Sequence, residues 1–79
     1  MSIKVLFFGA IRDLIGETEI VLPLTFEIRT KDAVLHITER FTLLKDRKLL
    51  CALNEHYAIG EEILKDGDEL AIFTAVSGG

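Results

Sequence analysis

The sequence has few of the residues that form cross-links or bind metals. Its 79 residues include one cysteine, one proline, one tyrosine and no tryptophan. A lone thiol, Cys51, excludes an intramolecular disulfide and suits a reducing compartment. Without tryptophan, aliphatic residues and five phenylalanines must form the core. We therefore expect one small domain held together by apolar packing alone.

Long hydrophobic runs are also missing. The apolar stretch 5–11 is far shorter than the ~20 residues that a membrane-spanning helix needs. Arg12 and Asp13 follow it directly, and no small-residue cleavage site is present, so we do not expect a signal peptide. These features predict a protein of the cytosol (cytoplasmic) that does not contact membranes.

Positive charge is scarce, since nine basic residues face thirteen acidic ones and the net charge is −4. A nucleic-acid-binding protein normally carries a basic stripe, so we expect no nucleic-acid partner. Six acids and a single base, Lys65, lie between residues 54 and 79. This acidic half suits a partner with a basic groove, but it is equally typical of a solvated surface.

The apolar pattern alternates between strand-like and helix-like spacings. Val34, Ile37, Phe41 and Leu44 recur every three or four residues, which predicts a helix over about 31–42, with Thr30 as its N-cap. The pattern of residues 25–29 is ambiguous, so no helix or strand is predicted there. Strands are predicted over 3–8, 18–22, 49–53, 57–58 and 69–73, and turns over 12–16, 54–56 and 65–68.

This order of elements predicts an α+β fold in two layers. Two strands precede the helix and the others follow it, as in the ubiquitin-like β-grasp, where one main helix packs on one face of a mixed sheet. We therefore expect a β-grasp domain over residues 1–73 and a flexible tail over residues 74–79.

The tail ends in Gly78 and Gly79. Residues without a Cβ can enter a narrow channel and adopt backbone angles closed to other residues. Six extended residues reach ~20 Å at most. A random sequence ends in two glycines about once in 200, and a tag remnant could also produce the pair, so the dipeptide alone is a moderate signal. Following directly on the last β-grasp strand, it indicates a carboxyl group presented on a thin arm.

Several segments resemble the small, sulfur-carrying subunit of molybdopterin synthase, a ubiquitin-like β-grasp family. The similar segments are 3–8, 12–16, 52–55, 66–70 and 76–79. The resemblance spans nearly the whole chain and is weakest over 23–47. Family members often carry two prolines where this chain has Thr74 and Ala75, and the absence of proline predicts a looser tail.

The resemblance implies a carrier rather than an enzyme acting alone. An ATP-dependent enzyme similar to ubiquitin-activating enzymes would adenylate Gly79, and sulfur from a persulfide would convert it to a thiocarboxylate. The large synthase subunit would then receive the tail (Val76, Ser77, Gly78 and Gly79) and use the sulfur to build the dithiolene of molybdopterin. The chain itself would bind no cofactor and no metal, and two copies of each subunit would form a heterotetramer.

Partner recognition needs a surface. Strand alternation places Phe8 and Phe73 on the sheet face away from the helix, near Tyr57 and Leu6. The resemblance implies that partners bind this face, because family members dock through it. Alternatively, one or both phenylalanines pack under a loop.

Other interpretations stay open. The chain could serve a thiamine, tRNA-thiolation or protein-tagging pathway, or it could be a ubiquitin-like interaction module whose two glycines are incidental. An enzyme built on Cys51 is a third class, although a buried cysteine usually behaves as a small hydrophobic residue. His36 and His56 lack a clear third zinc ligand. The basic cluster Lys45, Arg47 and Lys48 suits a solvated loop better than a phosphate site.

Overall fold

The computed structural model describes residues 1–75, so Val76, Ser77, Gly78 and Gly79 lie outside the described part of the chain. The elements, in chain order, are β1 (Ser2–Phe7), α1 (Gly9–Ile15), β2 (Glu19–Pro23), α2 (Thr30–Arg40), the short 3-10 helix η1 (Thr42–Leu44), β3 (Leu49–Leu53), β4 (His56–Tyr57) and β5 (Glu69–Thr74). Within residues 1–75, no helix has both the length and the apolar character required to cross a bilayer.

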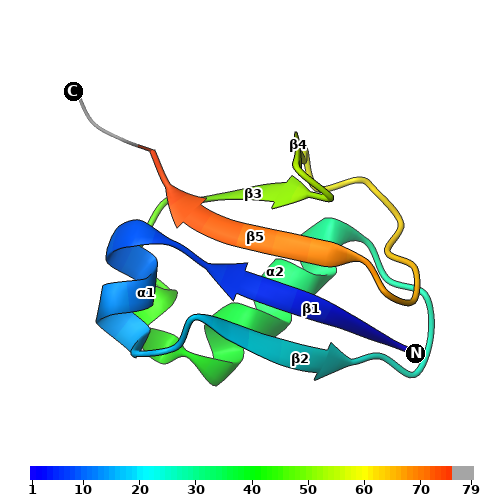
Figure 1. The fold of residues 1–79 in the computed structure, drawn as a ribbon, viewed down its shortest axis with the longest axis horizontal. Coiled ribbons are helices and arrows are strands. Elements are labelled where there is room, and N and C mark those ends of the chain that lie inside the picture. The colour runs from blue at the N-terminus through cyan, green and yellow to red at the C-terminus, as the bar shows by residue number, and fades with distance from the viewer. Residues whose placement is uncertain (76–79) are drawn as a thin grey trace.

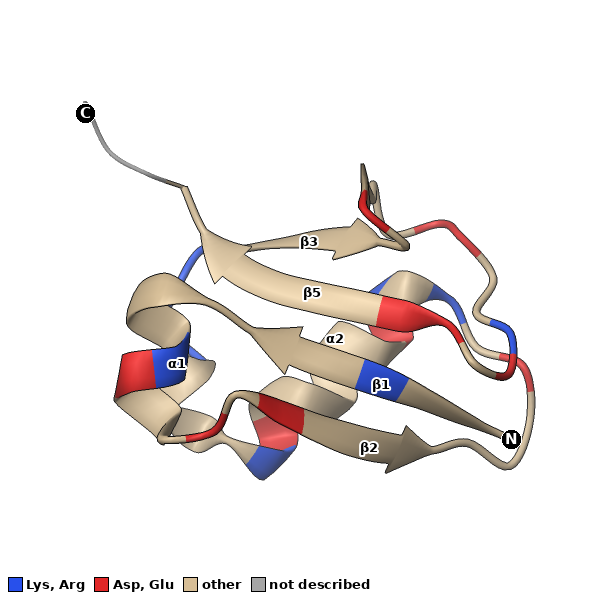
Figure 2. Cartoon of the chain, viewed as in Figure 1, with Lys and Arg blue, Asp and Glu red and all other residues tan. Residues whose placement is uncertain are grey.

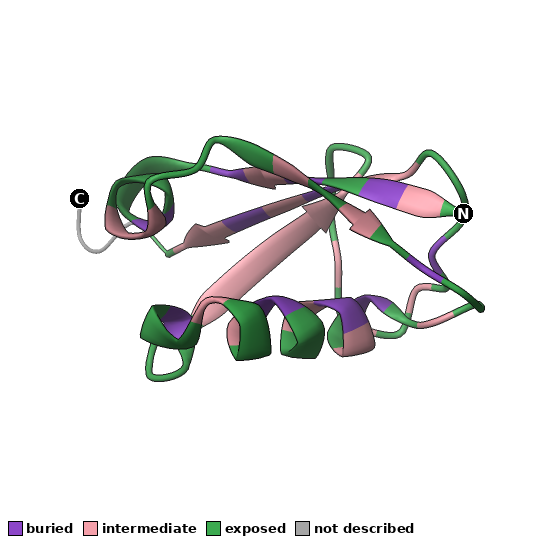
Figure 3. Cartoon of the chain, turned by 90° about the horizontal axis from the view of Figure 1, so that it is seen from below, coloured by how far each residue is buried: buried purple, intermediate pink, exposed green. Residues whose placement is uncertain are grey.

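The strands form one mixed sheet in the order β2-β1-β5-β3-β4. β1 and β5 run parallel at its centre, whereas the other neighbouring strands are antiparallel. α2 crosses beneath one face of the sheet, which gives two layers (Figures 1 and 3). This arrangement confirms the predicted α+β, ubiquitin-like β-grasp fold with one main helix on one face.

The core lies between this face and α2. Alternate residues of β1 and β5 point into it, and all are at most 1% exposed: Ile3, Val5, Phe7, Leu70 and Ile72. The predicted apolar stripe is shared by two elements: Val34 and Ile37 belong to α2, Phe41 follows its end, and Leu44 belongs to η1. Ile37 and Leu44 are buried, and Val34 and Phe41 are partly buried against the core. The strand alternation and the helical spacing read from the sequence are thus confirmed.

The helix α1 was not predicted, and the expectation of a turn over 12–16 is wrong. A seven-residue helix is too short to show a clear apolar period, and only Ile11 is fully buried. Gly16 ends it in the left-handed conformation (φ 76°), and its N–H donates to the Arg12 carbonyl at 2.8 Å. Gly16 is therefore a helix cap, for which glycine is the favoured residue.

The start of α2 also differs from the prediction. Arg29 is the N-cap and Thr30 is the first helical residue. The buried Thr30 hydroxyl donates to the Glu62 carbonyl at 3.3 Å, so it joins α2 to the segment at residue 62 rather than capping the helix. The Arg29 N–H donates to Asp32 Oδ2 at 3.0 Å, so Asp32 satisfies one unpaired group of the first turn. The predicted N-cap was wrong by one position.

A carboxylate organises the loop that supports this helix start. Glu62 accepts hydrogen bonds from the N–H groups of Ile59 (2.8 Å) and Gly60 (3.0 Å). These bonds, that of Ile59 first, lower the pKa of Glu62. The Gly60 carbonyl in turn accepts from the Lys31 N–H at 3.0 Å, which joins the loop to α2.

Candidate functional site

Three aromatic residues meet on the sheet face that α2 leaves open. Phe73 follows the buried Ile72 and therefore points to the opposite face, where it is half-buried. Phe8 is 47% exposed and Tyr57 is 79% exposed. The rings of Tyr57 and Phe73 lie 5.9 Å apart between centroids. We call Phe8, Tyr57 and Phe73 the aromatic surface; the structure thus brings together the three residues named from the sequence.

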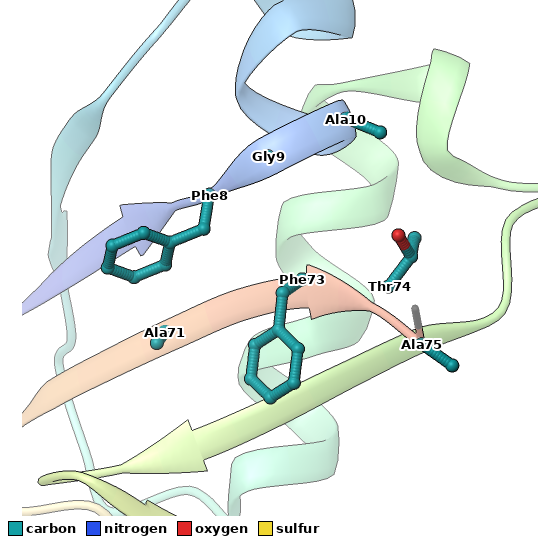
Figure 4. A pocket seen from close by; sticks show the side chains of 7 residues that line it. All are labelled: Phe8, Gly9, Ala10, Ala71, Phe73, Thr74 and Ala75. Carbon is teal, nitrogen blue, oxygen red and sulfur yellow. The ribbon is translucent and has the colours of Figure 1, made fainter. Parts of the chain in front are cut away.

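A hollow of about 480 Å³ lies between two of these rings. Figure 4 shows the side chain of Phe8 just after the end of β1 and that of Phe73 on the neighbouring β5, with only small side chains around them. Seven uncharged residues line it: Phe8, Gly9, Ala10, Ala71, Phe73, Thr74 and Ala75. An apolar hollow of this kind suits an apolar side chain of a partner protein.

Backbone geometry holds Phe8 beside β5. Phe7 pairs with Ile72 in the parallel ladder, and the Phe8 N–H donates to the Ile72 carbonyl at 3.2 Å. Phe8 is still extended (φ −125°), whereas Gly9 has a φ of +54°, which turns the chain into α1. That left-handed angle favours glycine, so Gly9 sets where the strand ends and where the hollow begins.

The sequence prediction missed five lining residues. Ala71 lies two residues before Phe73 on β5 and therefore shares its face, but it was not assigned a role. Gly9 and Ala10 belong to α1, which was not predicted, so no pattern placed them here. Thr74 is part of β5 and pairs with Leu49, and Ala75 follows at the rim of the hollow. The predicted reacting residue, Gly79, and the other tail residues lie outside the described part.

Metal ligands do not cluster within residues 1–75. No three His, Cys, Asp or Glu side chains come close enough to hold a metal ion. Burial, and secondarily the charge of Glu62, raises the pKa of the half-buried Cys51 thiol. A raised pKa lowers the thiolate fraction at neutral pH, which disfavours Cys51 as a nucleophile.

Acidic side chains gather around the turn that leads into β5, far from the hollow (Figure 2). Part of this charge holds the turn together. Asp66 Oδ1 accepts from the Ser2 N–H at 2.8 Å, and Asp68 Oδ2 accepts from the Lys65 N–H at 2.7 Å. Asp68 Oδ1 also accepts from Asn54 Nδ2 at 3.0 Å. Asp66 and Asp68 therefore stabilise the turn itself, independently of any partner that binds the acidic half of the chain.

Comparison with known proteins gives one consistent result. The ThiS family profile matches residues 5–79. The molybdopterin synthase sulfur carrier subunit of Escherichia coli (strain K12) is 38% identical over 98% of this chain and 99% of its own. A chain in the complex of subunits 1 and 2 of molybdopterin-converting factor from Helicobacter pylori has a TM-score of 0.72 and 27% identity, with full coverage of both chains. The fold also matches small archaeal modifier protein SAMP1 of Haloferax volcanii, with a TM-score of 0.87, 21% identity and full coverage of both chains.

Proposed function

Because this chain belongs to the ThiS family, we propose that it is the sulfur carrier subunit of a molybdopterin synthase. The 38% identity to the carrier of that synthase extends over nearly the full length of both chains and favours this acceptor over the thiamine pathway. The observation that carries the proposal is the apolar hollow at the end of β5, where the chain enters its last residues. A carrier needs a docking surface at that place.

The reacting group of this proposal is the carboxyl group of Gly79. A carboxylate is ionised at neutral pH and is a poor acyl donor. We infer that its oxygen attacks the α-phosphorus of ATP on an activating enzyme, which releases pyrophosphate and leaves an acyl-adenylate. The terminal sulfur of a protein persulfide then attacks the acyl carbon and AMP departs. A second thiol cleaves the resulting acyl disulfide, which leaves a thiocarboxylate and a new disulfide.

The large synthase subunit would receive this thiocarboxylate. From Ala75, four extended residues reach ~14 Å at most. A partner that covers the aromatic surface could therefore keep its active site about that far from the hollow. The partner holds the pterin substrate and forms the dithiolene, and the carrier returns as a carboxylate. The chain is thus the sulfur-donating subunit of a sulfurtransferase complex and needs no cofactor of its own.

We further propose that two carriers and two large subunits form a heterotetramer in the cytosol. The exposed aromatic surface supports a protein partner, since Tyr57 presents 79% of its surface in the isolated chain. The activating enzyme would use the same surface at a different time. The net charge of −4 argues against nucleic acid as a partner.

The test is the intact mass of the full chain after co-expression with a matching activating enzyme and a sulfur donor. Replacement of one oxygen by sulfur adds about 16 Da. A control chain that carries one extra alanine after Gly79 should show no gain, because its terminal carboxylate no longer fits the activating site. A wild-type chain that stays at its original mass, while a known carrier gains sulfur under the same conditions, would exclude the proposal.

A further inference from the structure

β2 lies at one edge of the sheet and has β1 as its single neighbour (Figure 1). At the start of this strand, the Thr18 carbonyl accepts from the Phe7 N–H at 2.9 Å. At its end, the Leu24 N–H donates to the Met1 carbonyl at 2.8 Å. Residues 18, 20, 22 and 24 therefore bond to β1, because alternate residues of an antiparallel ladder face the same neighbour.

The backbone groups that point outward from β2 belong to Glu19, Val21 and Pro23. Among the residues that the structure describes, none bonds to these outward groups. Pro23 suits its place, since the N–H that proline lacks would have pointed away from β1. The free stretch of backbone therefore extends over the whole of β2.

The side chains along this edge are apolar at its centre. Val21 lies opposite Lys4 on the open face and is 60% exposed. Ile20 and Leu22 point toward α2 and are half-buried. A mainly apolar pocket of about 150 Å³ opens at the end of the strand, and Phe26 in its lining is 70% exposed. Free backbone groups with apolar side chains beside them are a template for pairing with another chain.

A second copy of this chain fits the edge in an antiparallel arrangement with the two Val21 residues opposite each other. Each Val21 then exchanges both of its hydrogen bonds with the other Val21. Each Glu19 N–H donates to the Pro23 carbonyl of the other copy. On the face toward α2, each Ile20 lies opposite Leu22 of the other copy, so apolar side chains meet on both faces.

The charge of Glu19 and the missing N–H of Pro23 select this register. A centre at Ile20 would bring the two Glu19 side chains to diagonal positions ~7–8 Å apart, and a centre at Glu19 would place them directly opposite. A shift the other way would pair Val21 with Pro23, which has no N–H to donate. Centred on Val21, the two carboxylates lie four positions apart, and each stays beside Lys4 of its own chain, whose Nζ is 4.0 Å from Glu19 Oε2.

We propose that β2 is a dimerisation edge, at which two copies of this chain pair antiparallel around Val21 and form one continuous sheet. The pairing leaves the hollow open, because its lining residues come from α1, β5 and the residues next to them, and β1 separates β2 from β5. The dimer is therefore independent of the proposed function. Since one short strand forms the contact, we expect a weak, reversible dimer with a Kd on the order of 0.1 mM.

Sedimentation equilibrium of the full chain under reducing conditions tests the dimer. The mean mass should rise from close to the 8.8 kDa of one chain at ~10 µM toward twice that value at ~1 mM. Val21→Lys should weaken self-association at least ~10-fold, because it places two like charges directly opposite each other. Leu43→Lys is the matched control: Leu43 is 63% exposed and lies in η1, away from β2, so this variant should associate like the wild type.

Disulfide cross-linking under mild oxidation tests the register. Val21→Cys should give a covalent dimer, since directly opposite residues have Cα atoms ~5.5 Å apart, within reach of a disulfide. Glu19→Cys should not, because its two copies would lie more than ~13 Å apart. The wild type controls for links through the half-buried Cys51.

The outcomes decide between a dimer edge and a solvated one. A single-chain mass at every concentration would overturn the proposal. Dimers that form equally well with Val21→Lys, or equal cross-linking at positions 19 and 21, would place the contact elsewhere and would also overturn it. None of these results depends on whether Gly79 gains sulfur, so the proposed function stands or falls separately.

Discussion

The two faces of the sheet differ in what covers them, although the same strands build both. On the face toward α2, Leu70 and Ile72 of β5 are fully buried. On the other face, Ala71 and Phe73 of the same strand are only half-buried and border the hollow. A shift of one residue along β5 thus separates a side chain that stabilises the fold from one that is available to a partner. Stability and partner recognition can therefore be changed separately in this chain.

The largest expected effect is on the covered face. Ile72→Ala should lower the free energy of unfolding by about 2–4 kcal/mol, because it removes apolar contacts and leaves a cavity in a closed core. Phe73→Ala should cost only ~1 kcal/mol, since Phe73 is half-exposed, borders the hollow and loses mainly its aromatic pairing with Tyr57 at 5.9 Å between ring centroids. Chemical denaturation of both variants measures the difference. Equal losses would mean that the two faces do not divide the tasks as described.

A smaller but specific effect is expected on the open face. Phe73→Asp should keep the fold and weaken binding of the large subunit by ~2–4 kcal/mol, because a charge would enter an apolar contact. The matched control is Val21→Asp on β2, which adds the same charge at an exposed apolar residue outside the aromatic surface. Calorimetry measures both affinities. Binding of the Phe73 variant at wild-type strength would contradict the assignment of this face.

The smallest effect on stability is expected in the loop of residues 59–62, which belongs to neither face of the sheet. Hydrogen bonds from Ile59 and Gly60 lower the pKa of Glu62 in the folded state. The stabilisation from Glu62 is therefore complete above its unfolded pKa and is lost as the pH falls through its folded pKa. Glu62→Gln should lower the denaturation midpoint at neutral pH, and the difference from the wild type should vanish in acid. A difference independent of pH would contradict this role.

Much of the fold could be predicted because its apolar pattern is simple. Ile3, Val5 and Phe7 alternate with more exposed residues, and the spacing of Val34 and Ile37 matches one face of a helix. The helix α1 could not be found this way, since a single buried residue, Ile11, defines no period. Its signal was the glycine cap at Gly16, which could equally have been read as a turn residue.

The candidate site was predicted in part, for the same reason. Alternation placed Phe8 and Phe73 on one face, and the structure brings them together with Tyr57 at the hollow. The hollow itself depends on Gly9 and Ala10, whose place follows from the unpredicted helix.

The last strand of the chain is also the middle strand of the sheet, since β5 lies between β1 and β3. β1 with β2 and β3 with β4 pair on opposite sides of β5, so residues 69–74 are needed to join the two parts of the sheet. The pairing of Lys4 with Glu69 therefore closes a loop that spans most of the chain. The strand that completes the sheet is therefore also the strand that leads toward the C-terminal residues, so a chain with an incomplete sheet lacks the base from which a carrier presents its end to an enzyme.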